Sequence, residues 1–341
     1  MKLIGKWLVA ILLILTAFLV STYKWQIPEY TYDQSETFAN FDEYYQKELE
    51  ISKKEQTRPD NEEKLVRYSD EKTPLAILYV HGFGASRVEG EDMINQVAET
   101  FQSNLYYVRL PGHGTNVEDH KNTQFPKYLQ DAETALLMST QLGEKVVLVG
   151  TSMGGLISTY LAAKHPDKVA AVILASPFYD FTTADSNVFR FSWGVSFIHM
   201  LLGEIRKSAE QDSKNESYNY WYRNQYYDAI QHIMNLKRFI EKEDSLSKIE
   251  DPILMFYFYK SEAIQDRSAS VKAMLTSFDK IQHNGKASPL NRAVKVEEGD
   301  HVLFSRFAKV DKPLLYKEMV DFITKTTGVE PAKPSSKKVK R

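Results

Sequence analysis

The 341-residue chain contains no cysteine. This absence excludes disulfide bonds, thiolate metal sites and a cysteine nucleophile. The chain also lacks a marked excess of either charge, since 43 Lys and Arg stand against 45 Asp and Glu, so nothing in the composition indicates a nucleic-acid partner. With 43% hydrophobic residues, the chain can bury a large core, either as one α/β domain with insertions or as two smaller domains.

The N-terminus carries an uncharged apolar run over residues 7–23, preceded by Lys2 and Lys6. This run is about long enough to cross a hydrocarbon core of roughly 30 Å. Because the sequence LVS near its end is a poor match to an Ala-x-Ala cleavage site, a transmembrane signal-anchor over residues 1–23 is favoured over a cleaved signal peptide. A buried first helix is the remaining alternative. The two lysines predict that this end stays in the cytoplasm and that the rest of the chain is extracytoplasmic.

Residues 24–63 form a polar, aromatic connector in which FDEYYQKELEISKKEQ has apolar residues at near-helical spacing, so a short helix is expected. From residue 64, apolar runs alternate with helical stretches. The runs are continuous rather than alternating, which suits parallel strands covered on both faces. This rhythm predicts a doubly wound, mostly parallel α/β sheet. The predicted strands are residues 75–82, 104–110, 145–150, 168–176, 252–259 and 292–300.

The central sequence VVLVGTSMGGLIS contains Gly150-x-Ser152-x-Gly154. Ser152 follows a predicted strand by two residues and stands at the first turn of the next helix, where a nucleophile elbow must lie. The two glycines would relieve steric crowding in this sharp turn. The helix N-terminus would direct backbone N–H groups and a partial positive charge at a developing oxyanion. Ser152 is therefore the candidate nucleophile.

Four motifs occur in order along the chain: HGFGAS at 81–86, RLPGHG at 109–114, GTSMGG at 150–155 and GDH at 299–301. With them the chain resembles, over about residues 64–325, the α/β-hydrolase superfamily, and within it the branch of monoacylglycerol lipases, bacterial carboxylesterases and serine aminopeptidase-like proteins. The resemblance implies an α/β-hydrolase fold with a helical cap, and an oxyanion hole made by the backbone N–H groups of Phe83 and Met153.

The resemblance also implies the chain order serine, acid, histidine, so the base must follow Ser152. His301 directly follows the last predicted strand, in the GDH motif, and is the candidate base. His199 and His232 lie in a cap-like stretch, and His283 lies in a polar connection. The earlier histidines of HGFGAS and RLPGHG are interpreted as structural residues that shape their loops.

The acid is expected in the loop after the strand at 252–259. Many relatives show a glycine, two variable residues and an aspartate there, whereas this loop has no glycine and carries Glu262 at the expected position. Glu262 is therefore the preferred acid. Asp266, which could cap the next helix, and Asp180 stay open as alternatives. Asp300 is interpreted as a local turn residue.

Residues 181–250 interrupt the alternation of strands and helices and are rich in aromatic residues. We expect a helical cap whose aromatic side chains form its own core and, in part, an apolar ceiling over Ser152. The α/β-hydrolase core would then consist of residues 64–180 and 251–326. Residues 327–341 end in KKVKR and are predicted to be a basic, flexible tail.

These features predict a membrane-anchored serine hydrolase that cleaves carboxylic esters, with a small-molecule or lipid-derived substrate and no metal or organic cofactor. A serine at the elbow argues against the epoxide hydrolases and dehalogenases of this fold, which use an aspartate there. A non-catalytic, membrane-anchored binding module on the same fold is one alternative. The other is an aminopeptidase-like peptidase, in which a carboxylate cluster of the cap would hold the substrate amine; its candidate residues are Glu204, Glu210, Asp212 and Glu216.

Overall fold

The computed structural model describes residues 2–207 and 214–333, and of residues 2–5 the backbone only. Within these residues the central sheet has eight strands in the order β1-β3-β2-β4-β5-β8-β10, with β9 paired to β8. The pairs β1–β3 and β8–β9 are antiparallel and the other neighbours are parallel, so the predicted mostly parallel sheet is confirmed. The strands are β1 (Lys64–Val66), β2 (Ala76–Val80), β3 (Asn104–Val108), β4 (Val146–Thr151), β5 (Val169–Ala175), β8 (Ile253–Ser261), β9 (Ile264–Gln265) and β10 (Arg292–Val296).

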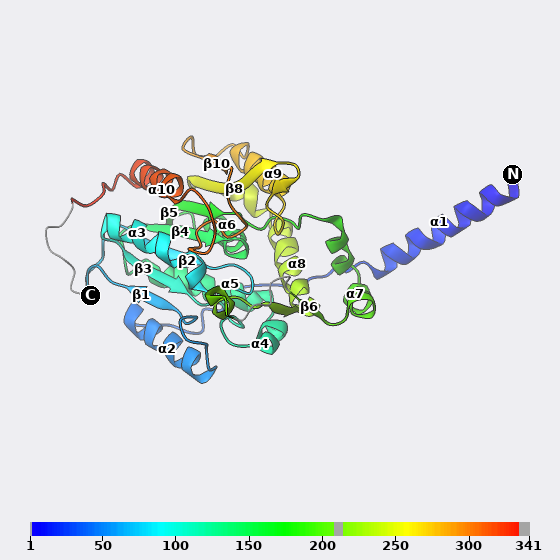
Figure 1. Cartoon of the computed structure of the whole chain (residues 1–341), viewed down its shortest axis with the longest axis horizontal. Coiled ribbons are helices and arrows are strands. Elements are labelled where there is room, and N and C mark those ends of the chain that lie inside the picture. The colour runs from blue at the N-terminus through cyan, green and yellow to red at the C-terminus, as the bar shows by residue number, and fades with distance from the viewer. Residues whose placement is uncertain (1, 208–213, 334–341) are drawn as a thin grey trace.

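Helices cover both faces of this sheet (Figure 1), and their bounds are α3 (Glu91–Phe101), α5 (Phe125–Ser139), α6 (Met153–Lys164), α9 (Val271–Gln282) and α10 (Lys312–Thr327). The short helix α4 (Val117–Asn122) instead contacts the cap. Successive side chains of a strand point to opposite faces. In β2, Ile77 and Tyr79 pack with the apolar residues of α3 and α10, whereas Leu78 and Val80 pack with those of α5 and α6. Burial on both faces explains why the strands read as continuous apolar runs.

The N-terminal segment contributes to this packing. The predicted helix of the connector is α2 (Phe41–Lys54), and the Asn40 side chain caps it by accepting the Glu43 N–H at 2.9 Å. Tyr44 of α2 lies against Tyr106 of β3, with their ring centroids 5.8 Å apart. The connector is therefore packed against the core and does not simply link two parts of the chain.

The first helix, α1 (Lys2–Thr22), extends away from the rest of the fold (Figure 1). In the part of the chain that the structure describes, no helix combines the length and the apolarity that a membrane crossing requires. The predicted membrane span over residues 7–23 therefore has no support from the structure.

In the sequence, the cap lies between β5 and β8, which are neighbours in the sheet. Several aromatic and aliphatic residues expected to form its own core are buried, among them Phe189, Tyr222 and Phe239. The longest cap helix packs on α5, where the rings of Phe239 and Phe125 lie 5.4 Å apart. A short antiparallel hairpin, β6–β7, adds strands to a region predicted to be helical. The cap elements are η2 (Ala184–Arg190), α7 (Gly194–Leu202), β6 (Ile205–Lys207), η3 (Glu216–Asn219), β7 (Asn224–Tyr226), α8 (Tyr227–Lys242) and η4 (Ser245–Lys248).

Candidate active site

Ser152 occupies the turn between β4 and α6 in a conformation that L-residues rarely adopt, with φ of 54° and ψ of −117°. Such a backbone costs roughly 1–3 kcal/mol and persists only where its surroundings hold it. Here the Ser152 N–H donates to the Ala175 carbonyl at 3.0 Å, and the Ser152 carbonyl accepts the Phe178 N–H at 2.9 Å. Contacts to the end of β5 thus fix the sharp turn that carries the serine.

The two glycines beside Ser152 are required by close backbone packing. A Cβ on Gly154 would lie 2.0 Å from the Val80 carbonyl oxygen of β2, and a Cβ on Gly150 would lie 2.4 Å from the Gly154 carbonyl oxygen. Neither contact can be relieved by moving a side chain, because both involve backbone atoms. The steric reason predicted for these glycines is confirmed.

A chain of hydrogen bonds joins Ser152, His301 and Asp266. The Ser152 Oγ lies 2.8 Å from His301 Nε2, and His301 Nδ1 lies 2.7 Å from Asp266 Oδ2. The other oxygen of Asp266 accepts the backbone N–H groups of Ser268 at 2.8 Å and Ala269 at 3.0 Å. Three segments far apart in the sequence therefore meet at the carboxyl ends of the parallel strands.

Two pKa shifts follow from this arrangement. Burial alone would lower the pKa of His301, but the adjacent Asp266 carboxylate raises it above its ordinary value. Burial would raise the pKa of Asp266, yet His301 and the N–H groups of Ala269 and Ser268 hold it below its ordinary value. Asp266 is thus ionised at neutral pH and accepts a hydrogen bond from Nδ1–H. The proton stays on Nδ1, which leaves Nε2 as the acceptor that faces Ser152.

The structure corrects the prediction that Glu262 contacts His301. Glu262 is exposed in the turn between β8 and β9, where it accepts the Tyr259 hydroxyl at 2.9 Å. Strand β8 continues to Ser261 and pairs back on β9, so the loop that faces His301 begins only at Asp266. The contact expected of Glu262 is made by Asp266, which is 1% exposed.

The remaining acidic candidates lie elsewhere or act locally. Asp180 accepts the N–H of Phe181 at 2.8 Å, and its other oxygen lies 3.3 Å from Lys237 Nζ. Asp300 accepts the N–H of His301 at 2.7 Å, which agrees with its interpretation as a turn residue. Asp266 is the carboxylate that the structure brings to the imidazole ring.

Glu89 is a second buried carboxyl group at the site, and neither a motif nor a periodic pattern in the sequence indicates it. One of its oxygens accepts the Gly82 N–H at 2.5 Å and the Tyr79 hydroxyl at 3.1 Å. Its side chain lines the same pocket as Ser152. Burial raises the pKa of Glu89 to about 8, although the Gly82 N–H, the Tyr79 hydroxyl and His301 act in the opposite direction.

The predicted oxyanion residues lie at this pocket or beside it. Met153 begins α6, where a backbone N–H has no acceptor within its own helix. Phe83 lines the pocket with Ser152, and its ring packs on His120 with centroids 4.4 Å apart. His81 accepts the Leu110 N–H at 3.0 Å, and burial lowers its pKa to about 4, so it is a neutral structural residue that holds two loops together.

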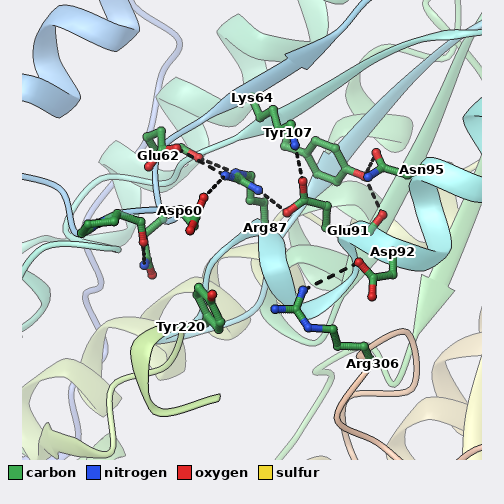
Figure 2. A network of polar contacts seen from close by, with 12 residues as sticks. Asp60, Glu62, Lys64, Arg87, Glu91, Asp92, Asn95, Tyr107, Tyr220 and Arg306 are labelled. Atoms are coloured by element: carbon green, nitrogen blue, oxygen red, sulfur yellow. Dashed lines mark hydrogen bonds and ion pairs between the residues drawn. The ribbon is translucent and has the colours of Figure 1, made fainter. Parts of the chain in front are cut away.

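A polar network holds the segment that follows HGFGAS (Figure 2). Arg87 is 5% exposed; it donates to the Glu62 carbonyl at 3.0 Å and forms ion pairs with Glu62, Asp60 and Glu91. These contacts tie the connector to the start of α3. Because a buried guanidinium is costly unless it is paired, these contacts hold Arg87 and the segment around it in place.

The cap closes the other side of the pocket, which has a volume of about 570 Å³. Of the cap aromatics, Trp221 and Tyr222 line it, and most of the other lining side chains from the cap are polar or charged. Of the carboxylates proposed to hold a substrate amine, Glu216 pairs with Arg306 and Glu204 is exposed. Glu210 and Asp212 lie outside the described residues, as does the basic sequence KKVKR.

Comparison with known proteins agrees with this arrangement. The family model described as alpha/beta hydrolase fold matches residues 76–225. A pimeloyl-[acyl-carrier protein] methyl ester esterase from Neisseria meningitidis is 31% identical over 109 residues, which are 32% of this chain and 39% of that protein. A thermostable monoacylglycerol lipase from a Bacillus species is 34% identical over 100 residues, which are 28% of this chain and 38% of that protein. The matches thus span about two fifths of these relatives' own length.

Solved structures share the fold over most of the chain. A structure described under LipS and LipT, two metagenome-derived lipolytic enzymes, has a TM-score of 0.60 at 19% identity and covers 79% of this chain and 99% of that chain. The monoacylglycerol lipase of Paleococcus ferrophilus has a TM-score of 0.54 at 15% identity, and the match covers 77% of this chain and 99% of that chain. The fold that the four motifs imply is confirmed, and the chain has the α/β-hydrolase fold.

Proposed function

We propose that this protein is a serine hydrolase that cleaves carboxylic esters through an acyl-enzyme, with Ser152 as nucleophile, His301 as general base and Asp266 as the group that orients His301. The observation that carries the proposal is the unbroken hydrogen-bond chain from Ser152 Oγ to the Asp266 carboxylate. A serine hydroxyl is barely ionised at neutral pH, so it needs such a base to become a nucleophile.

In the first step, Ser152 Oγ attacks the ester carbonyl carbon while its proton moves to His301 Nε2. The new imidazolium is stabilised by the Asp266 carboxylate, which accepts from Nδ1 and keeps its own charge. The carbonyl oxygen becomes an oxyanion, to which the N–H groups of Met153 and Phe83 would donate. Preorganised donors of this kind are worth about 3 kcal/mol each in other hydrolases.

The tetrahedral intermediate then collapses. The bond to the alcohol oxygen breaks, and that oxygen takes the proton from Nε2, leaving the acyl group on Ser152. In the second half, His301 accepts a proton from water, the water oxygen attacks the acyl carbon, and the Ser152 oxygen recovers the proton. The products are one alcohol and one carboxylic acid, and His301 returns to its starting state.

Two relatives support ester bonds as the target, since one is a methyl ester esterase and the other a monoacylglycerol lipase. The described part of the cap supports this choice over a peptidase, because Glu216, one of the carboxylates available for a substrate amine, is paired with Arg306. The non-catalytic module is disfavoured by the strained backbone of Ser152, which a binding fold would not need.

The test combines an active-site probe with two substrates. A fluorophosphonate should label the intact protein and not Ser152→Ala, and 4-nitrophenyl butyrate should be hydrolysed far faster than aminoacyl 4-nitroanilides. Turnover of the anilides alone would favour the peptidase. Absence of labelling in both folded proteins would favour the binding module.

Membrane attachment and an extracytoplasmic location stay proposals from sequence, supported by the apolar run at residues 7–23 and the lysines before it. Carbonate-washed membranes should retain the full chain and lose a chain that starts at residue 24. Because the chain has no cysteine, Lys272→Cys supplies a single exposed thiol. An impermeant maleimide should label it in intact cells; labelling only after lysis would contradict the proposed location.

A further inference from the structure

The pocket above Ser152 has two unlike walls. The core wall carries Ser152, His301 and the loop of Gly82 and Phe83. The cap wall carries the hairpin β6–β7, in which Arg206 lies opposite Gln225. Because the core wall contains the reacting groups, we expect the cap wall to contact the parts of a substrate that lie away from the reacting carbonyl.

Basic side chains are concentrated on the cap wall. Arg206 and Lys207 of β6 and Arg223 before β7 all line the pocket. Within the described residues, Arg206 and Lys207 are exposed and make no ion pair or side-chain hydrogen bond. Arg223 donates to the Ser217 hydroxyl. The pocket is therefore cationic at this wall although the whole chain has a net charge of −2.

Few negative charges offset these cations inside the pocket. Among the residues that the structure describes, the carboxyl groups that line it are Glu89 and Asp300. Burial raises the pKa of Glu89 to about 8, so this group is largely neutral at pH 7. Asp300 lies beside His301, at the core wall, and its carboxylate is already bonded to the His301 N–H. The described part of the lining is thus net positive, and its cations come from the cap wall.

The hairpin that presents the cations is seated on the loop beside Ser152. The Tyr222 N–H donates to the Gly84 carbonyl at 2.8 Å, and the Tyr222 hydroxyl accepts the Thr115 N–H at 2.9 Å. The side chain of Gln225 packs so closely on Gly84 that a Cβ there would lie 2.3 Å from it. The cations are therefore placed at a fixed end of the pocket.

We infer that the substrate is an ester that also carries an anionic group, a carboxylate or a phosphate, which Arg206 and Lys207 bind while the ester carbonyl lies at Ser152. This inference rests on the proposed function. A guanidinium presents a planar fork of donors that matches both anions, and an ammonium adds a strong point charge. The cationic wall also attracts anionic substrates from solution. An apolar acyl chain would leave both charges unused.

The experiment uses two matched pairs of esters that differ only in charge. The first pair places the anion on the acyl side: 4-nitrophenyl hydrogen suberate against 4-nitrophenyl methyl suberate, followed by nitrophenolate release. The second places it on the alcohol side: 1-butyrylglycerol 3-phosphate against 1-butyrylglycerol, followed by butyrate release. The readout is the ratio of kcat/KM for the charged ester to that for the neutral ester.

The variant Arg206→Gln/Lys207→Gln removes both cations, and Lys54→Gln/Lys272→Gln removes the same charge from exposed lysines that do not line the pocket. We expect the ratio to exceed one for at least one pair in the wild type and in the control variant, by about fivefold to tenfold at low salt, since two partly exposed charge contacts contribute about that much. In the pocket variant the ratio should fall to about one, and 0.5 M salt, roughly the range where surface charges are screened, should lower it in the wild type.

A ratio near one in the wild type for both pairs would overturn the inference, and so would a ratio that the pocket variant leaves unchanged. A misfolded variant lowers turnover of both esters of a pair together and does not imitate the expected change in ratio. Failure of the proposed function looks different: none of the four esters is hydrolysed and the fluorophosphonate labels nothing.

Discussion

The two walls of the pocket differ in how far their functional side chains are buried. Ser152 and Asp266 of the core are buried, whereas Arg206 and Lys207 of the cap are exposed. The reacting groups are therefore held inside the packed core, and the cations of the cap stand at the surface.

This difference separates two requirements of a hydrolase. Reacting groups must be held within a fraction of an ångström, which only buried, fully bonded loops achieve. Substrate recognition tolerates looser placement, because charge attraction acts over several ångströms. Substitutions at the core wall should therefore lower the rate of hydrolysis of every substrate alike. The effect of substitutions at the cap wall should differ from one substrate to another.

The largest effect is expected from the buried acid. Asp266→Asn keeps the shape of the side chain but removes the charge that holds Nδ1–H toward it, so kcat should fall by about 10³-fold to 10⁴-fold, as in other hydrolases with this arrangement. The exposed Glu262→Gln is the matched control and should stay within about twofold of the wild type. Both are measured as initial rates of 4-nitrophenyl butyrate hydrolysis.

The contrast between buried and exposed groups fails if Glu262→Gln causes the larger loss, because an exposed carboxylate would then control the imidazole. Circular dichroism of both variants should match the wild type. If Asp266→Asn alone unfolds the chain, Asp266→Ser, which keeps a short polar group, can replace it.

The sequence could predict the strands because β2, β3, β4, β5 and most of β8 are buried on both faces and carry continuous apolar runs. It could also predict that Ser152 and His301 come together, since each follows a strand end directly within a short motif. The sequence places the carboxylate partner of His301 four residues too early, at Glu262 instead of Asp266, because the end of β8 is exposed and polar and its pairing with β9 has no apolar signature. The hairpin β6–β7 was missed for the same reason: none of the three residues of either strand is buried.

A smaller effect, on stability, is expected from filling the closest contact of the core. Gly154→Ala places a methyl group against the Val80 carbonyl and should lower the free energy of unfolding by about 1–3 kcal/mol, the range for overpacked cores. Gly155→Ala is a graded control, since its Cβ would lie 3.0 Å from the Pro177 side chain. Each substitution is made in the Ser152→Ala variant, and urea denaturation measures its effect on the free energy of unfolding. Equal effects of the two substitutions would contradict the close packing of α6 on β2 at Gly154.

The smallest effect concerns Glu89, where the core meets the open pocket. Its pKa of about 8 in the folded state lies above its ordinary value of 4.5. As the pH rises from about 4.5 to 8, the unfolded chain releases this proton and the folded chain keeps it, so the wild type loses stability over that window. Glu89→Gln cannot ionise and still accepts the Gly82 N–H. The variant should therefore gain stability relative to the wild type: the difference between their free energies of unfolding, variant minus wild type, should increase by at least about 1 kcal/mol between pH 5 and pH 8.

Urea denaturation at pH 5, 6.5 and 8 measures this difference. Other carboxyl groups with raised pKa values, such as the half-buried Glu48 and Asp131, are present in both proteins and cancel in it. A difference that stays constant with pH would mean that Glu89 is ionised and solvated in the folded protein. In that case the pocket would hold a second full negative charge next to Ser152, the core wall would be less tightly closed than the packing of Gly154 indicates, and the preference for anionic esters would weaken.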